Sequence, residues 1–197
     1  RRQSIRLKGY DYSRPGAYFI TICLNERRNL LGQIVQGRTH LSDAGIMVRD
    51  AWHQLPDFYS GFDIDEFVVM PNHIHGIIFI KSVISSQNGQ ARVPAPTPDS
   101  FSLPDVVHRF KTLTTKRYAG GVRTLDWPSF RKRFWQRNYH EHIIRDDSRL
   151  AAIRRYIQRN PENWEMDTEN RNSIPIAQKR KYWEAFLNLK DSGMNRA

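Results

Sequence analysis

The sequence predicts an α+β fold in which helices cover one face of an antiparallel sheet, with one more helix following at the C-terminal end. Two observations support this class. The hydrophobic pattern gives the order strand, helix, strand, strand, helix, strand, helix along the chain. Two apolar runs, 62–70 and 73–80, are separated only by Pro71 and Asn72, which favours an antiparallel pair. This order is typical of a ferredoxin-like or RRM-like sandwich.

The first half of the chain supplies a strand, a hairpin, a helix and the paired strands. The hairpin is expected to turn at Gln36-Gly37, and the helix to begin at the capping residue Ser42 and to end at Pro56. We expect these elements over residues 17–24, 32–41, 42–56, 62–70 and 73–80.

The second half begins with residues 82–100, which are rich in Ser and Pro and indicate a flexible surface insertion. A helix is expected from Ser102 to Tyr118, ended by two glycines, and a strand over 134–144. The last helix is capped by residues 146–148 and ended by Pro161. We therefore expect one domain over residues 1–164, containing the insertion, and a basic extension over 165–197.

The charge points to a polyanionic partner. The 197 residues carry a net charge of +11. Residues 101–197 hold 20 basic and 11 acidic residues, against 11 and 9 in residues 1–100. The segment 109–137 is especially basic and has aromatic residues among its charges, which suits phosphate contacts and base stacking, although a solvated face gives the same pattern.

The same sequence argues against a membrane protein. Its most apolar stretch, 17–24, has eight residues, far fewer than the roughly 20 that span a bilayer. Cys23 is the only cysteine, so the chain has no internal disulfide. We expect a cytoplasmic protein with no membrane partner.

The most informative motif is Pro71-Asn-His-Ile-His75. Side chains alternate along a strand, so His73 and His75 project to one side and can chelate one divalent ion, while Ile74 faces the core. The alternative is two unrelated histidines on an exposed strand.

The last helix carries a second candidate group. Tyr156 and Asn160 are four residues apart and share one helical face. A phenol can attack phosphorus, and an amide oxygen can ligate a hard cation. The alternative is a core tyrosine and a helix C-cap before Pro161.

These motifs occur together in an order that resembles the REP-associated tyrosine transposases, within the single-tyrosine transposases of the HUH endonuclease class. The resemblance rests on the histidine pair after Met-Pro-Asn and on Tyr-Ile-x-x-Asn-Pro about eighty residues later. Further matching segments lie at 9–12, 16–19, 67–72 and 134–145, and the match covers about residues 4–164.

The resemblance implies a single-stranded DNA endonuclease and strand transferase that acts at palindromic hairpins. It implies that His73 and His75 hold Mg²⁺ or Mn²⁺, that Asn160 completes the metal site, and that Tyr156 is the nucleophile of a covalent 5′-phosphotyrosine intermediate. Single-stranded or hairpin DNA is the expected partner, and the protein is expected to be a monomer or homodimer.

The expected DNA-binding residues come from the basic segment, with phosphates bound by Arg and Lys and bases stacked on aromatic rings. They are Arg109, Lys111, Lys116, Arg117, Arg131, Lys132, Arg133, Trp135 and Arg137. Two other functions stay open: a catalytically idle nucleic-acid-binding module on the same fold, and a metal-dependent phosphodiesterase that uses water.

Tyr139 is a competing nucleophile because polar residues surround it in the segment 135–142. On a strand, Tyr139 and Glu141 would share one face, and His140 and His142 the other, so a second His-x-His site is conceivable. The alternative is that these residues shape the sheet edge or contact DNA.

Overall fold

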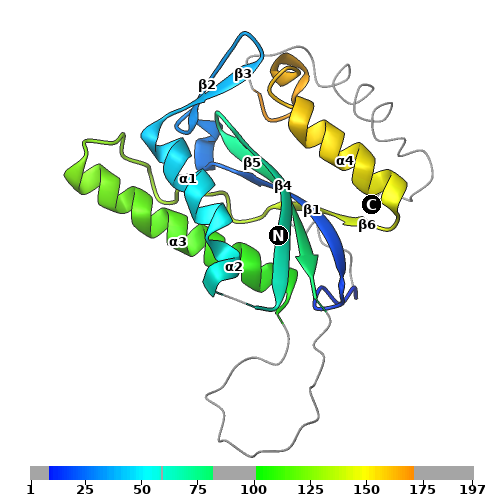
Figure 1. Cartoon of the computed structure of the whole chain (residues 1–197). Helices are drawn as coiled ribbons and strands as arrows, with labels where there is room; N and C mark the ends of the chain where they lie inside the picture. The colour runs from blue at the N-terminus through cyan, green and yellow to red at the C-terminus, as the bar shows by residue number, and fades with distance from the viewer. Residues whose placement is uncertain (1–8, 59, 82–100, 171–197) are drawn as a thin grey trace, which may run out of the picture.

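The computed structural model of the chain describes residues 9–58, 60–81 and 101–170. The predicted insertion at 82–100 lies outside these ranges, as does the extension from residue 171 onward. The described strands form an antiparallel sheet with the order β4-β5-β1-β6. Figure 1 shows α1 and α3 on one side of this sheet and α4 on the other. The predicted fold class is therefore confirmed.

The elements follow the predicted order closely. The sheet strands are β1 (Gly16–Cys23), β4 (Phe62–Met70), β5 (His73–Ile80) and β6 (His140–Ile144). The helices are α1 (Asp43–His53), α2 (Leu55–Phe58), α3 (Leu103–Thr124) and α4 (Asp147–Arg159). A separate hairpin pairs β2 (Gly32–Val35) with β3 (Arg38–Leu41), and short 3₁₀ turns occur at Asn25–Arg27 and Trp164–Met166.

Three predicted boundaries are wrong. Helix α1 ends at His53, and Pro56, which was expected to end it, lies inside α2. Helix α3 continues through Gly120 and Gly121 because a ring packs onto it: a Cβ at position 121 would lie 2.3 Å from the Trp127 side chain. The last strand begins at His140 rather than at residue 134. The preceding residues form a loop, of which only Trp135 bridges to Leu24.

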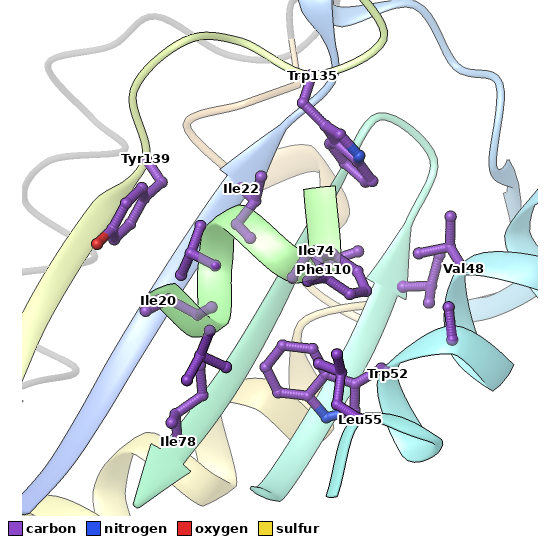
Figure 2. Packing of buried hydrophobic residues seen from close by; sticks show 14 of the residues in the cluster. Ile20, Ile22, Val48, Trp52, Leu55, Ile74, Ile78, Phe110, Trp135 and Tyr139 are labelled. Carbon is purple, nitrogen blue, oxygen red and sulfur yellow. The ribbon is translucent and has the colours of Figure 1, made fainter. Parts of the chain in front are cut away.

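Each face of the sheet has its own apolar cluster. Figure 2 shows the larger one, where Ile20 and Ile74 of the sheet meet Trp52 of α1 and Phe110 of α3. Beneath α4 a smaller cluster contains Phe19, Ile77, Ile153 and Ile157. Alternation along β1 and β5 therefore assigns every second residue to the α4 face.

Among the described helices, none combines the length and the apolar character that a membrane-spanning segment needs.

Candidate metal and tyrosine site

His73 and His75 begin strand β5, directly after the tight turn that connects it with β4. Both imidazoles lie on the α4 face, while Ile74 between them packs into the opposite core. The two residues are 0% and 2% exposed. Their Nε2 atoms are 3.0 Å apart. The structure therefore brings the two imidazoles to one point inside the protein.

Each imidazole is held from behind at Nδ1. The Asn72 amide nitrogen donates to the Glu169 backbone oxygen, so Asn72 Oδ1 accepts from the Nδ1–H of His73 at 2.8 Å. Thr21 on strand β1 hydrogen-bonds His75 Nδ1 through Oγ1, also at 2.8 Å. Such partners fix the ring orientation and leave Nε2 as the atom that faces the site.

Tyr156 reaches the same point from α4. Its hydroxyl oxygen lies 3.0 Å from His75 Nε2 and donates to Asp167 Oδ2 at 3.4 Å. The ring is 3% exposed and packs edge-on against Phe19, with ring centroids 6.0 Å apart. Tyr156 is therefore both a packed residue of the α4 face and a neighbour of the histidine pair.

Asp167 completes the group and was missed from the sequence. After Pro161 ends α4, the chain turns back through Trp164–Met166 and places Asp167 Oδ2 3.7 Å from the Nε2 atoms of both His73 and His75. It lies just beyond the predicted domain boundary at residue 164. The available signal was a pair of acids, Asp167 and Glu169, at the start of a segment expected to be basic.

Asn160 also reaches the site, one helical turn after Tyr156. Its amide nitrogen donates to Asp167 Oδ2 at 3.2 Å. Its Oδ1, the predicted ligand atom, is buried and has no hydrogen-bond partner among the described residues. A buried acceptor without a partner is rare and fits a site that takes up a cation.

The ionisation of the group also suits a cation. Burial lowers the pKa of His73 to about 3, although the Asp167 carboxylate opposes this effect. The imidazole is therefore neutral at pH 7, with a lone pair available at Nε2. Burial alone would raise the pKa of Asp167, but its contacts with His73, His75 and the Glu169 N–H outweigh burial and hold that pKa well below its usual range.

The geometry fits a divalent ion. The ligand atoms of His73, His75 and Asp167 all lie within 4.8 Å of one another. Two ligands bound at about 2.1 Å and at right angles would be about 3.0 Å apart. The two Nε2 atoms have this separation. The described residues contain no other cluster of three such ligands.

The segment after α4 encloses the site. Trp164 stacks on His73 with ring centroids 6.0 Å apart. The Glu169 carboxylate pairs with Arg27 at 2.9 Å and accepts from the Cys23 thiol at 3.1 Å. Burial, followed by the charge of Glu169, raises the pKa of Cys23. These contacts hold Asp167 against the histidines.

The competing candidates lie elsewhere. Tyr139 belongs to the cluster on the α3 face, as Figure 2 shows, so the sheet separates it from His75. His140 and His142 do lie on the α4 face, opposite Thr21 and Phe19 respectively. They form no three-ligand cluster within the described ranges.

Four of the predicted DNA-binding residues lie on α3, on the side of the sheet away from the histidine pair: Arg109, Lys111, Lys116 and Arg117. Three of them make internal contacts. The Arg109 guanidinium lies over the Phe101 ring, 5.0 Å from its centroid. Lys111 donates to the Gln136 backbone oxygen at 2.6 Å, and Arg117 donates to Gln54 Oε1 at 2.9 Å. The structure therefore does not bring this group together with Tyr156.

The other four basic residues are exposed in the loop before β6: Arg131, Lys132, Arg133 and Arg137. Backbone hydrogen bonds join this loop to the end of β1, from Asn25 to Phe134 at 2.7 Å and from Gln136 to Cys23 at 2.9 Å. Cys23 is in turn the register partner of His73. The loop therefore lies at the same end of the sheet as the histidine pair.

Trp135 requires a correction. It was predicted to stack on exposed bases, but it is only 3% exposed. Its indole N–H donates to Thr114 Oγ1 at 2.8 Å, and its ring packs against Phe110 and Phe134. The neighbouring ring of Phe134 is 2% exposed. Tertiary packing thus makes both rings part of the core, with no open face for a base.

Comparison with known proteins gives three informative relatives. An uncharacterized protein of Haemophilus influenzae is 40% identical over 174 residues, which cover 84% of this chain and 91% of the relative. A "Putative REP-associated tyrosine transposase" of the same organism is 28% identical over 77% of this chain and 73% of its own length. A solved REP-associated tyrosine transposase bound to a REP hairpin has a TM-score of 0.52 at 21% identity, covering 81% of this chain and 74% of that one. No model of a known protein family matches the chain.

Proposed function

We propose that the chain is a REP-associated tyrosine transposase, a metal-dependent endonuclease and strand transferase of single-stranded hairpin DNA. The 28% identity with a putative REP-associated tyrosine transposase and the shared fold of the solved one support this proposal. One observation carries the proposal: the Tyr156 hydroxyl lies 3.0 Å from His75 Nε2, inside the group that can hold a divalent ion. The REP hairpin in the related solved structure supports hairpin DNA as the partner.

The cleaving step uses Tyr156 as the nucleophile. Its oxygen bonds to phosphorus as the bond between phosphorus and the 3′ oxygen breaks, which leaves a 5′-phosphotyrosine and a free 3′-hydroxyl. Asp167 Oδ2 accepts the hydrogen bond of the phenol and so orients its oxygen, and the phenolic proton passes to solvent water as the bond to phosphorus forms. The departing 3′ oxygen takes a proton from water.

His73, His75 and Asp167 are the residues that would hold Mg²⁺ or Mn²⁺, with Asn160 Oδ1 as a further oxygen donor. When bound, such a cation offsets the charge that gathers on the phosphate oxygens. Asn72 and Thr21 keep the two Nε2 atoms turned toward this point.

The phosphotyrosine bond conserves the energy of the phosphodiester. A second 3′-hydroxyl can therefore attack phosphorus and release Tyr156, which joins two strands without an external energy source. Since His75, Tyr156 and Asp167 all come from one chain, this chemistry needs no second subunit. We assign it to the domain over residues 1–164 together with Asp167.

DNA binding is assigned to the exposed basic loop that holds Arg131, Lys132, Arg133 and Arg137, which contacts phosphates at the histidine end of the sheet. Because Tyr156 is 3% exposed, the scissile phosphate reaches its hydroxyl only when the groups around it shift.

The test is a denaturing gel of the protein incubated with single-stranded hairpin DNA and Mn²⁺. We expect a covalent adduct that carries a 3′-terminal label, is lost in Tyr156→Phe and persists in Tyr139→Phe. Loss of the adduct in Tyr139→Phe alone would contradict the choice of nucleophile. Cleavage without an adduct would indicate a phosphodiesterase that uses water, and binding without cleavage would indicate an idle binding module.

A further inference from the structure

Strand β4 carries an irregularity that faces α4. Its pairing with β5 shifts register between Ile64 and Phe67, which leaves Asp65 and Glu66 at a bulge. The Asp65 carboxylate accepts a hydrogen bond from the Glu66 N–H at 2.6 Å, so the side chain braces the bulge itself. Bulges often redirect side chains near functional sites.

Both acidic residues at the bulge bind α4. Arg154 Nε donates to Asp65 Oδ1 and Oδ2 at 3.2 and 3.1 Å, and its Nη2 also contacts Oδ2. Gln158 Nε2 donates to Glu66 Oε1 at 2.7 Å. Arg154 and Gln158 are one helical turn apart, and Tyr156 lies midway between them in sequence.

These contacts are directional, and the apolar packing beneath α4 is not. Contacts of Ile153 and Ile157 with the sheet are not directional, so they resist separation of the helix better than rolling about its axis. A tyrosine hydroxyl lies about 9 Å from its helix axis, so a roll of about 10° moves it about 1.5 Å. A displacement of about 1 Å can cost about 100-fold in rate.

We propose that the Asp65–Arg154 ion pair and the Glu66–Gln158 hydrogen bond are positioning contacts that fix the rotation of α4 and so hold the Tyr156 hydroxyl against His75. This inference rests on the proposed function and adds four residues to it. The pair contributes little to overall stability, because the Arg154 side chain is 41% exposed.

The test compares Asp65→Arg, Arg154→Asp and the double swap with wild type. At saturating hairpin DNA, each single variant should form the covalent adduct about 10- to 100-fold more slowly, with an unchanged Kd for DNA and a nearly unchanged Tm. The double swap should recover to within about threefold. The matched control is the exposed pair of Asp63 with Lys81, 2.9 Å apart at the start of β4, whose variants should keep the wild-type rate.

A second readout needs no DNA. The ¹⁹F resonance of 3-fluorotyrosine at position 156 should shift in Asp65→Arg and return in the double swap. An unchanged resonance or adduct rate in the single variants would overturn the positioning role. If wild type forms no adduct while the resonance responds as expected, the proposed function fails but the mechanical coupling of the bulge to Tyr156 stands.

Discussion

The hydroxyl of Thr21 allows a sharp test of the metal site. In the metal-bound state His75 Nε2 must hold its lone pair toward the ion, so Nδ1 carries the proton and needs an acceptor. Thr21→Val keeps the shape of the side chain and removes the Oγ1 that lies 2.8 Å from Nδ1. The lost buried hydrogen bond costs about 1–3 kcal/mol. Since metal-free His75 can shift its proton to Nε2, most of that cost falls on the bound state.

We therefore expect Thr21→Val to bind Mn²⁺ about 10- to 100-fold more weakly, measured by isothermal titration calorimetry. Thr114→Val is the matched control, because Thr114 is also buried and hydrogen-bonded but lies on the α3 face. It should lower the free energy of unfolding by about 1–3 kcal/mol and leave the Mn²⁺ affinity unchanged. Wild-type affinity in Thr21→Val, or an equal loss in Thr114→Val, would refute the assignment of His75 as a ligand.

Three further predictions concern the same site. Mn²⁺ should bind at least about tenfold more tightly than Mg²⁺ in calorimetry, because two ligands are imidazole nitrogens and Mg²⁺ prefers oxygen; equal affinities would argue against ligation by the histidines. The free energy of unfolding of the metal-free protein should fall as pH drops from 6.5 toward 3, by up to about 1.4 kcal/mol per pH unit. Burial lowers the pKa of His73 to about 3, so in this range His73 takes up a proton in the unfolded chain but not in the folded protein. Urea unfolding across this range measures the slope, which should flatten in His73→Gln. Because burial raises its pKa, Cys23 should react with iodoacetamide at least about 100-fold more slowly in the folded protein than in urea, and equal rates would contradict the enclosure of the site.

Local sequence patterns predicted the part of the site that depends on local geometry. The period of two along β5 is enough to place His73 and His75 on one face, and the turn of four residues on α4 is enough to align Tyr156 with Asn160. Only the resemblance or the structure shows that the strand and the helix face each other. Nothing in either segment alone states which side of the sheet α4 covers.

The parts that the sequence did not predict depend on contacts distant in the chain. Asp167 reaches the histidines only because the chain turns back after Pro161, and its anchor, Glu169, binds Arg27 far away in sequence. Trp135 looked like a stacking residue because its neighbours are basic, yet Phe110 and Thr114 of α3 bury it. Composition cannot distinguish an exposed aromatic residue from a core residue when both occur in a polar segment.

The two faces of the sheet have different roles. The α3 face carries the larger apolar cluster and most of the fold's packing, so the α4 face can bury polar groups that would weaken a core. Burying these groups costs little because they hydrogen-bond one another. Asn72 and Thr21 hydrogen-bond the two histidines, and the Glu169 N–H and the Asn160 amide donate to Asp167. Among the described polar groups of this face, Asn160 Oδ1 is a buried acceptor without a hydrogen-bond partner, and an added cation would supply one.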